Sequence, residues 1–253
     1  MCGIFGICYS QAHGLQQQQL RDMLDRLYCL SQSRGKEASG ILVKSGEDLT
    51  IVKDSISGDR FIKSEPYKKL FSENKIRADR FTLIMGHARL DTNGSKQEPA
   101  NNAPIQYENI HGIHNGIVTN VDELWKSHPH LPRFRVVDSE VILALYFDAL
   151  GAGLSEAEAM QVVFGKIEGS ASVSLYSEAR QSLLLATNTG SLYVMDYGNG
   201  MLVYASEEYI LLQLKKKFSF LRKPVDVPVQ KIKPRTCLVY AIRQQSATRF
   251  EGN

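Results

Sequence analysis

A cysteine directly behind the initiator methionine is the strongest constraint on what this chain can fold into. The sequence opens Met1-Cys2-Gly3-Ile4-Phe5-Gly6, and residues 3–9 form the apolar run of a buried strand. Removal of Met1 would leave a thiol and a free α-amino group on Cys2, and an N-terminal nucleophile activated by its own amine can perform acyl transfer. The alternative is that Cys2 is only a small buried residue at the start of a strand.

The composition is that of an ordinary globular protein with reduced thiols. Hydrophobic residues make up 43% and charged residues 23% of the 253 positions. The four cysteines include no C-x-x-C pair, which argues against a disulfide framework or a zinc site. The first Lys or Arg is Arg21, so the opening does not resemble a signal peptide, and no apolar run approaches the roughly 18 residues of a membrane span. We therefore expect a cytoplasmic protein with no membrane partner.

Positive charge is concentrated at the end of the chain. Residues 210–253 carry ten Lys or Arg against Asp226 and Glu251, whereas the rest of the chain is net acidic. Two interpretations stay open: a solvated face, or a docking surface for a partner or an anionic ligand. No nucleic-acid partner is expected.

Hydrophobic periodicity predicts two groups of strands with helices between them. The expected strands are 3–9, 41–44, 49–53, 81–86, 109–118, 170–177, 182–187, 191–196, 201–206 and 236–242. The expected helices are 16–31, a charged stretch ending near 74, 139–150, 155–167 and 207–217. Residues 93–104 offer almost nothing to anchor a core and are predicted to be a mobile loop. Since no linker divides residues 1–253, we predict one α+β domain with two sheets layered with helices.

Several separated motifs accompany Cys2. They are Ser33-Arg34-Gly35-Lys36-Glu37-Ala38-Ser39-Gly40, Gly86-His87-Ala88-Arg89-Leu90-Asp91-Thr92-Asn93-Gly94, His114-Asn115-Gly116-Ile117-Val118 and Asp138-Ser139-Glu140. In this order and spacing they resemble the glutaminase domain of class II (N-terminal-nucleophile) glutamine amidotransferases, which include glucosamine-6-phosphate synthase and the purine amidophosphoribosyltransferase. The resemblance spans residues 2 to about 240. It implies a four-layer αββα sandwich of two antiparallel sheets.

The resemblance implies hydrolysis of the glutamine side-chain amide through a thioester on Cys2. The α-amine of Cys2 would relay protons, because its pKa near ~8 lets it accept one close to neutral pH. The side-chain amide of Asn115 and the backbone N–H of Gly116 match the oxyanion hole, in which one donor is worth about 3 kcal/mol. Gly116 would also let the backbone come close to the substrate. Arg34 matches a position near the nucleophile.

Free L-glutamine carries a carboxylate and an ammonium that need opposite partners. Arg89 matches the arginine that binds the α-carboxylate, and Asp138 matches the carboxylate that binds the α-ammonium. Thr92, Asn93 and Gly94 follow Arg89 and match further glutamine contacts. Taken singly, Arg89 could instead form a surface ion pair, and Asp138 could only cap the helix that it precedes.

The chain departs from its relatives at several loop positions. Relatives usually have Asp-Ser where this chain has Glu37-Ala38, and the sugar synthases have Trp-Ala where it has Leu90-Asp91. These changes affect the subfamily assignment more than the hydrolytic reaction.

Three histidines, His87, His111 and His114, suggest a metal or a general base. The sequence argues against both, because the amine of Cys2 supplies the base and the histidines lack the spacing of a ligand set. We expect His114 to be structural, and we expect no metal and no cofactor.

Ammonia released from glutamine needs an acceptor. The chain contains no second catalytic module, so we expect a separate synthase subunit or a fused synthase domain, with this chain a subunit or a fragment of a larger enzyme. Two alternatives remain. One is a degenerate regulatory or binding subunit without catalysis, and the other is an amidase for a different amide, which the pair Arg89 and Asp138 argues against.

Overall fold

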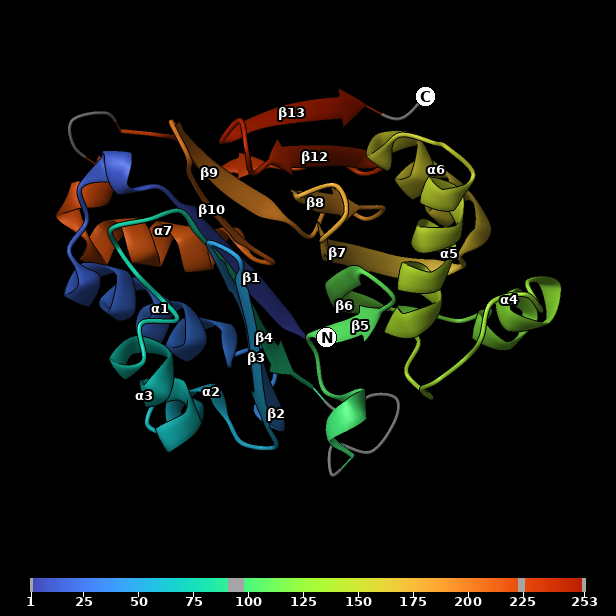
Figure 1. Cartoon of the computed structure of the whole chain (residues 1–253), viewed down its shortest axis with the longest axis horizontal. Coiled ribbons are helices and arrows are strands. Elements are labelled where there is room, and N and C mark those ends of the chain that lie inside the picture. Colours follow the sequence, from blue (N-terminus) through green and yellow to red (C-terminus); the bar gives the residue numbers. More distant parts are fainter. Residues whose placement is uncertain (1, 91–97, 223–225, 252–253) are drawn as a thin grey trace.

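Two antiparallel sheets form the centre of the protein (Figure 1). The computed structural model describes residues 2–90, 98–222 and 226–251. The first sheet has the order β11 (Gln230–Lys231), β9 (Tyr193–Gly198), β10 (Met201–Ala205), β1 (Gly3–Tyr9), β4 (Thr82–Arg89), β2 (Ala38–Ser45) and β3 (Asp48–Asp54). The second sheet has the order β13 (Ser246–Glu251), β12 (Thr236–Ala241), β8 (Ser182–Thr187), β7 (Gly169–Ser177), β6 (Ile110–Val118) and β5 (Ile105–Tyr107).

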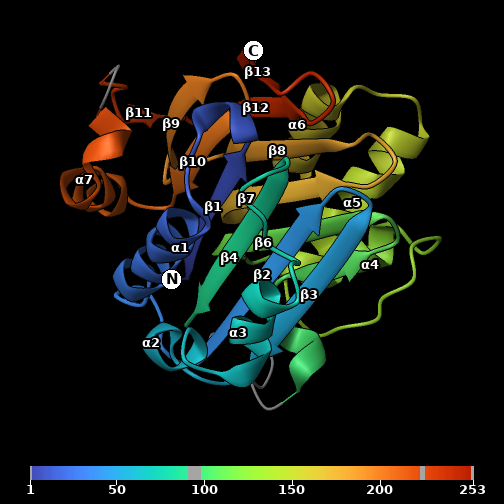
Figure 2. The same cartoon turned by 60° about the vertical axis from the view of Figure 1, so that its left-hand side comes forward.

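Helices cover the outer face of each sheet and complete four layers (Figures 1 and 2). On the first sheet lie α1 (Gln17–Ser31), α2 (Gly58–Phe61), α3 (Glu65–Ser72) and α7 (Glu208–Lys217). On the second sheet lie α5 (Ser139–Gly151) and α6 (Glu156–Lys166), with α4 (Val121–Ser127) next to α5. Three short 3-10 helices connect these elements: η1 (Gln11–His13), η2 (Pro99–Asn101) and η3 (Ser219–Arg222). The predicted α+β sandwich of αββα type is confirmed.

Strand β1 shows why its sequence is a continuous apolar run. Successive side chains of a strand point to opposite faces. Phe5 and Ile7 pack against the helix layer of the first sheet, whereas Ile4 and Cys8 pack between the two sheets. Both faces of the strand are therefore buried, and the strand that begins directly after Cys2 is fixed in the middle of the molecule.

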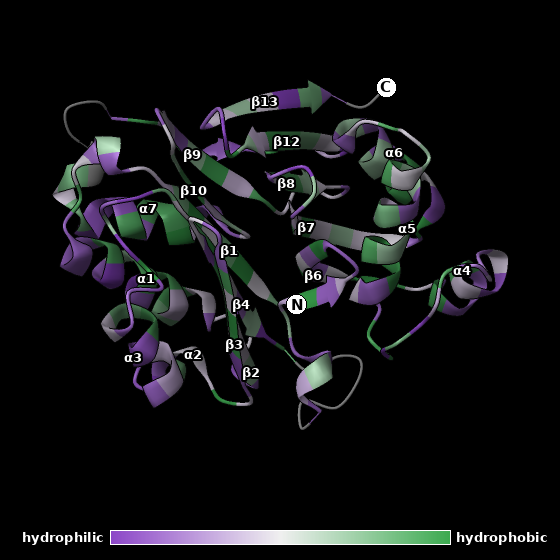
Figure 3. Ribbon diagram, in the orientation of Figure 1, coloured by the Kyte–Doolittle hydropathy of each residue, from purple (hydrophilic) through white to green (hydrophobic). Residues whose placement is uncertain are grey.

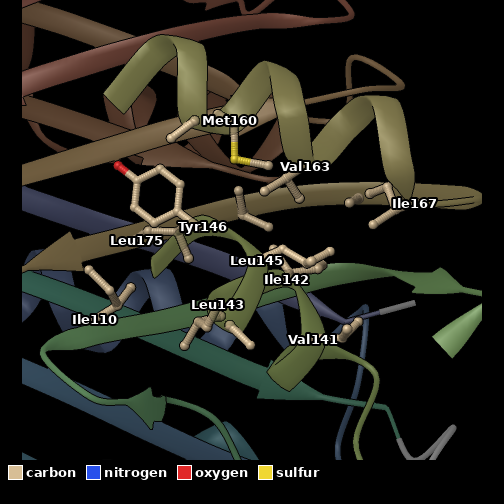
Figure 4. Close-up of a cluster of buried hydrophobic side chains, with 14 of the residues drawn as sticks. Ile110, Val141, Ile142, Leu143, Leu145, Tyr146, Met160, Val163, Ile167 and Leu175 are labelled. Carbon is tan, nitrogen blue, oxygen red and sulfur yellow. The ribbon is translucent and has the colours of Figure 1, made fainter. Parts of the chain in front are cut away.

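The second helix layer holds α5 against the second sheet (Figure 4). Met160 and Val163 of α6 point toward Tyr146 and Leu145 of α5, and all four side chains are buried. Since α5 is enclosed by β5, β6 and α6, most of its circumference is apolar. This packing fixes the N-terminal end of α5, which begins directly after Asp138.

Besides the 3-10 helices, one α-helix and three strands of the described residues were not predicted from the sequence: α4, β5, β11 and β13. Helix α4 is largely hydrophilic and buries only Leu124, so it lacks an apolar face (Figure 3). Strands β5 and β11 have three and two residues, too few to show a period of two. Strand β13 lies at the edge of its sheet with most side chains exposed, so neither face selects apolar residues.

The basic residues of 210–253 are divided between the two halves of the sandwich. Helix α7 belongs to the helix layer of the first sheet, and β12 and β13 belong to the second sheet (Figure 1). Two of these lysines form ion pairs within the region, Lys215 with Asp226 at 2.6 Å and Lys233 with Glu251 at 3.2 Å. A docking role for this region stays a prediction. Across the described residues, no helix is long and apolar enough to cross a membrane.

Candidate active site

The thiol of Cys2 lies at the open end of β1, beside the last residues of β4. Gly3 pairs with Ala88 in the antiparallel register, which brings Cys2 next to Arg89 and Leu90. The Sγ atom lies 3.6 Å from the carbonyl oxygen of Leu90, to which the thiol can donate. Burial raises the pKa of the Cys2 thiol, while the Leu90 backbone and the positive charge of Arg89 act in the opposite direction.

A cavity opens beside Cys2. Its walls come from both sheets and from the start of α5, which are distant in the sequence. The lining residues are Cys2, His87, Arg89, Leu90, Asn101, Ala103, Ile105, His114, Gly116, Val137, Asp138 and Ser139. The structure therefore brings together four of the predicted site residues, Cys2, Arg89, Gly116 and Asp138.

Arg89 supplies a buried positive charge to the cavity. It is the last residue of β4, and its side chain donates through Nη1 to Oδ1 of Asn102. Asn102 in turn donates through Nδ2 to Ser55 at 3.3 Å. Arg89 is only 4% exposed, so it is not half of a surface ion pair. A guanidinium held in this way suits a carboxylate, whose two oxygens it can bind together.

Asp138 supplies the negative charge from the other half of the sandwich. It occupies the N-cap position of α5 but makes no side-chain hydrogen bond to that helix. Its Oδ2 instead accepts the backbone N–H of Val118 at 2.9 Å, and its Oδ1 lies 3.9 Å from Nδ1 of His114. The carboxylate is therefore held by β6 rather than used as a helix cap.

Asn115 and Gly116 follow His114 on β6. Asn115 is buried, and its Oδ1 makes no hydrogen bond to any residue in the described part of the chain. Gly116 has a φ of 155°, and a Cβ there would lie 1.9 Å from the carbonyl oxygen of Ser170 on β7. Close packing of β6 on β7 therefore requires glycine at 116, a reason that the sequence did not indicate.

The segment 33–40 contributes to the site through its backbone. A Cβ on Gly35 would lie 2.2 Å from the carbonyl carbon of Arg89, and the N–H of Glu37 donates to the Arg89 carbonyl at 3.1 Å. Arg34 is not among the lining residues; its Nη1 lies 2.5 Å from Oε1 of Glu207, the residue before α7. Three further predicted residues, Thr92, Asn93 and Gly94, lie outside the described residues, as does part of the predicted loop 93–104.

Two histidines of the cavity are buried and uncharged near neutral pH. Burial lowers the pKa of His87 to about 3, against a smaller opposing effect of the His114 backbone. Burial also lowers the pKa of His114, although the Asp138 carboxylate opposes this. The third, His111, lies 2.7 Å from Glu178 and outside the cavity. No group of three or more His, Cys, Asp or Glu side chains among the described residues could hold a metal ion.

Sequence reasoning assigned no role to several lining residues. His87, His114 and Ser139 all lie within the recognised motifs, and their positions directly beside Arg89, Asn115 and Asp138 were the available signal. Asn101 and Ala103 had none, because they fall in the predicted loop 93–104, and Ile105 lies between that loop and the next predicted strand.

Comparison with known proteins gives a consistent result. The sequence profile of the glutamine amidotransferase domain family matches residues 87–213, half of the chain. The match includes Arg89, Asn115, Gly116 and Asp138, and it begins after Cys2 and Arg34.

The similar curated proteins are longer enzymes. The chain is 30% identical over 227 residues to the glutamine–fructose-6-phosphate aminotransferase (isomerizing) of Gluconobacter oxydans, covering 87% of this chain and 34% of that protein. It is 27% identical over 229 residues to the enzyme of the same name from Bradyrhizobium diazoefficiens, with the same coverage of each. The chain thus spans about a third of the length of these relatives.

Solved structures share the fold. The glutamine phosphoribosylpyrophosphate amidotransferase from B. subtilis, complexed with ADP and GMP, superposes with a TM-score of 0.65 over 99% of this chain and 49% of that chain. A structure described as the allosteric regulatory enzyme of purine biosynthesis gives a TM-score of 0.69 with the same coverage. Both are 17% identical to this chain, so the likeness concerns the fold alone.

Proposed function

This chain belongs to the glutamine amidotransferase domain family, class II with an N-terminal nucleophile, and from that premise we propose that it hydrolyses glutamine with Cys2 as the nucleophile. One observation carries the proposal: Cys2, Arg89 and Asp138 line the same cavity. An amino acid presents one carboxylate and one ammonium, so a buried guanidinium and a buried carboxylate beside a thiol suit its head group.

The proposed reaction has two halves. In the first, the Cys2 sulfur bonds to the amide carbon of the glutamine side chain, and the thiol proton passes to the α-amine of Cys2. That proton then goes to the leaving nitrogen, the C–N bond breaks, and ammonia departs from a thioester. In the second, water adds to the thioester carbon and gives up a proton to the α-amine; the C–S bond breaks, the α-amine passes that proton to the departing sulfur, and glutamate leaves.

Negative charge develops on the amide oxygen in both halves. We assign its stabilisation to the side-chain amide of Asn115 and the backbone N–H of Gly116, which are neighbours on β6. Gly116 lines the cavity, whereas Asn115 is not among its lining residues. In a side-chain amide only the nitrogen donates, so Nδ2 of Asn115 is the atom that would face the oxyanion. Arg34 does not line the cavity. We propose that it supports the site by pairing with Glu207.

The α-amine remains the best candidate for the proton carrier. A base works best with a pKa near the working pH. Burial lowers the pKa of His87 to about 3 and lowers the pKa of His114 as well, so both bind a proton poorly near neutral pH. A free α-amine titrates near ~8.

We further propose that the ammonia passes to an acceptor on a synthase subunit or fused synthase domain. The similar curated enzymes are named as aminotransferases to fructose 6-phosphate and are about three times as long as the matched region. The acceptor used with this chain, its cytoplasmic location and its organisation as one domain stay predictions.

The proposal is tested by combining intact-mass analysis with a glutaminase assay. Glutamate and ammonia should form in equal amounts, and only in protein that has lost the mass of one methionine. Full activity in protein that keeps Met1 would rule out the amine as the base. If protein with a free Cys2 amine formed no glutamate, a regulatory or binding role would replace the enzymatic one.

A further inference from the structure

We propose that His114 is a positioning residue that holds the Asp138 carboxylate ready for the α-ammonium of the substrate, in the tautomer that carries its proton on Nε2. The inference rests on the proposed function and assigns a task to a residue that the reaction itself does not use. His114 lies on β6 between the oxyanion residue Asn115 and the start of α5, so it touches both halves of the substrate site.

The tautomer follows from the two partners of the imidazole. Nε2 lies 3.4 Å from the carbonyl oxygen of Ser170, and a carbonyl oxygen can only accept. Nε2 therefore carries the hydrogen. A neutral imidazole has only one, so Nδ1 is bare and accepts the hydroxyl hydrogen of Ser139, whose Oγ lies at 3.1 Å. The assignment comes from the hydrogen-bond partners on both sides of the ring.

The bare Nδ1 determines what Asp138 can bind. Oδ1 of Asp138 lies 3.9 Å from Nδ1, which has no hydrogen to offer it. The other oxygen, Oδ2, already accepts the N–H of Val118 at 2.9 Å. No donor in the described part of the chain hydrogen-bonds Oδ1, so this oxygen stays available for an ammonium at the cavity wall.

A charged His114 would destroy this arrangement. With a hydrogen on Nδ1 it would pair with Oδ1 of Asp138 and take the place of the substrate ammonium. Arg89 and Asp138 together balance the charges of an amino acid, whereas a third, positive group would leave the site with a net positive charge. Burial of the imidazole among β6, β7 and α5 keeps it neutral.

Two substrates separate this role from simple packing. Glutamine carries the α-ammonium, and glutaramate (glutamine without its α-amino group) does not. In His114→Leu, the kcat/KM for glutamine relative to that for glutaramate should fall about tenfold, mainly through the KM for glutamine. The change removes the two hydrogen bonds of the ring, to Ser139 and to Ser170, and so loosens the position of Asp138, which precedes Ser139. His114→Asn, which can keep an acceptor for Ser139, should recover part of the ratio.

His111→Leu is the matched control, because His111 is a buried histidine on the same strand that faces Glu178 instead of the site. It should leave the ratio unchanged. If His114→Leu does not fold, Ser139→Ala removes the donor to Nδ1 and should lower the ratio about threefold. Equal losses for glutamine and glutaramate would overturn the inference and leave His114 as scaffold.

Binding measurements keep the inference separate from the proposed reaction. Dissociation constants for glutamine and glutaramate, measured in Cys2→Ala protein by calorimetry, do not depend on turnover. If that protein prefers glutamine and His114→Leu removes the preference, the positioning role holds even where the wild-type chain shows no hydrolysis. If His114→Leu keeps the preference, the positioning role is wrong while hydrolysis by Cys2 can still be correct.

Discussion

Cys2 and Cys8 lie six residues apart and start from the same geometry, yet they differ in almost every chemical respect. An even spacing along a strand places both side chains toward the space between the two sheets. Cys8 is fully buried there, opposite Leu83 of β4 and Leu202 of β10. Cys2 lies at the end of the same strand, where the sheets part and the cavity opens. The difference teaches that the distance from the open edge, rather than the residue or the face, decides what a thiol on this strand can do.

The electrostatic surroundings of the two thiols also differ with their distance from the open end of the strand. Burial raises the pKa of the Cys8 thiol far above its ordinary value, and the charge of Asp196 raises it further. Burial also raises the pKa of Cys2, but the Leu90 backbone and Arg89 oppose the rise. The view of a cysteine as a small buried apolar residue therefore describes Cys8, while Cys2 keeps the access and the positive neighbour that a nucleophile needs.

The sharpest way to break this comparison is to remove each thiol in turn. Cys2→Ala should lower the kcat for glutamine hydrolysis by at least ~10⁴-fold, because loss of a covalent nucleophile removes the main route of reaction. Cys8→Ala should keep kcat within about threefold, because Cys8 is not among the residues that line the cavity. Steady-state assays of both variants beside wild type give the two ratios. Similar losses in the two variants would show that the strand, and not the position of Cys2, carries the activity.

The sequence was most informative where local pattern and site coincide. Residues 3–9 alternate between two buried faces, and the motif around Arg89 ends a strand that pairs with them. Both features depend on neighbours along the chain, so strand, motif and cavity wall could be predicted together. The same holds for Gly116, although its physical reason, the approach of Ser170, was visible only in the structure.

The sequence left a choice open where a side chain had two equally good local uses. An aspartate before a helix looks the same whether it caps that helix or binds a ligand, and only the N–H of Val118, brought in by β6, separates the two for Asp138. Arg34 was placed near the nucleophile by its motif, but its direction depends on Glu207, which is distant in sequence. His114 was expected to be structural, and its hydrogen bond to Ser139, which joins a strand to a helix, could not be read from the sequence.

A second, smaller contrast should appear in thiol alkylation. The thiolate is the reactive form, so a raised pKa makes the rate climb until the pH passes the pKa. Iodoacetamide should modify Cys2 roughly 100-fold faster than Cys8, since Cys8 is both buried and more strongly shifted.

The pH dependence of the Cys2 alkylation rate shows in which direction the pKa of this thiol is shifted. For the chain as described, the rate at Cys2 should still be rising at pH 9.0, the ordinary value for a thiol, because burial raises its pKa. Peptide mapping by mass spectrometry between pH 7 and 10 gives both rates, and denatured protein gives the matched reference in which the two thiols react alike. A Cys2 rate that levelled off below pH 8 would mean that the groups that lower the pKa, the Leu90 backbone first among them, together outweigh burial.

The smallest expected effect concerns stability, and here the substitution of Cys8 should matter more than the substitution of Cys2. Cys8→Ala leaves a small void between tightly packed sheets and should cost about 1–2 kcal/mol of the free energy of unfolding, as loss of one buried sulfur-sized group does. Cys2→Ala should cost less than about 0.5 kcal/mol, because its side chain borders a cavity instead of a filled core. Urea unfolding of wild type and both variants measures the two differences. If Cys2→Ala proved the more destabilising, the Cys2 thiol would be a packing group, and the contrast that supports its catalytic assignment would be lost. Because β1 is buried along its length and the cavity opens at the residue before it, the substitution of Cys2 should reduce activity and the substitution of Cys8 should reduce stability.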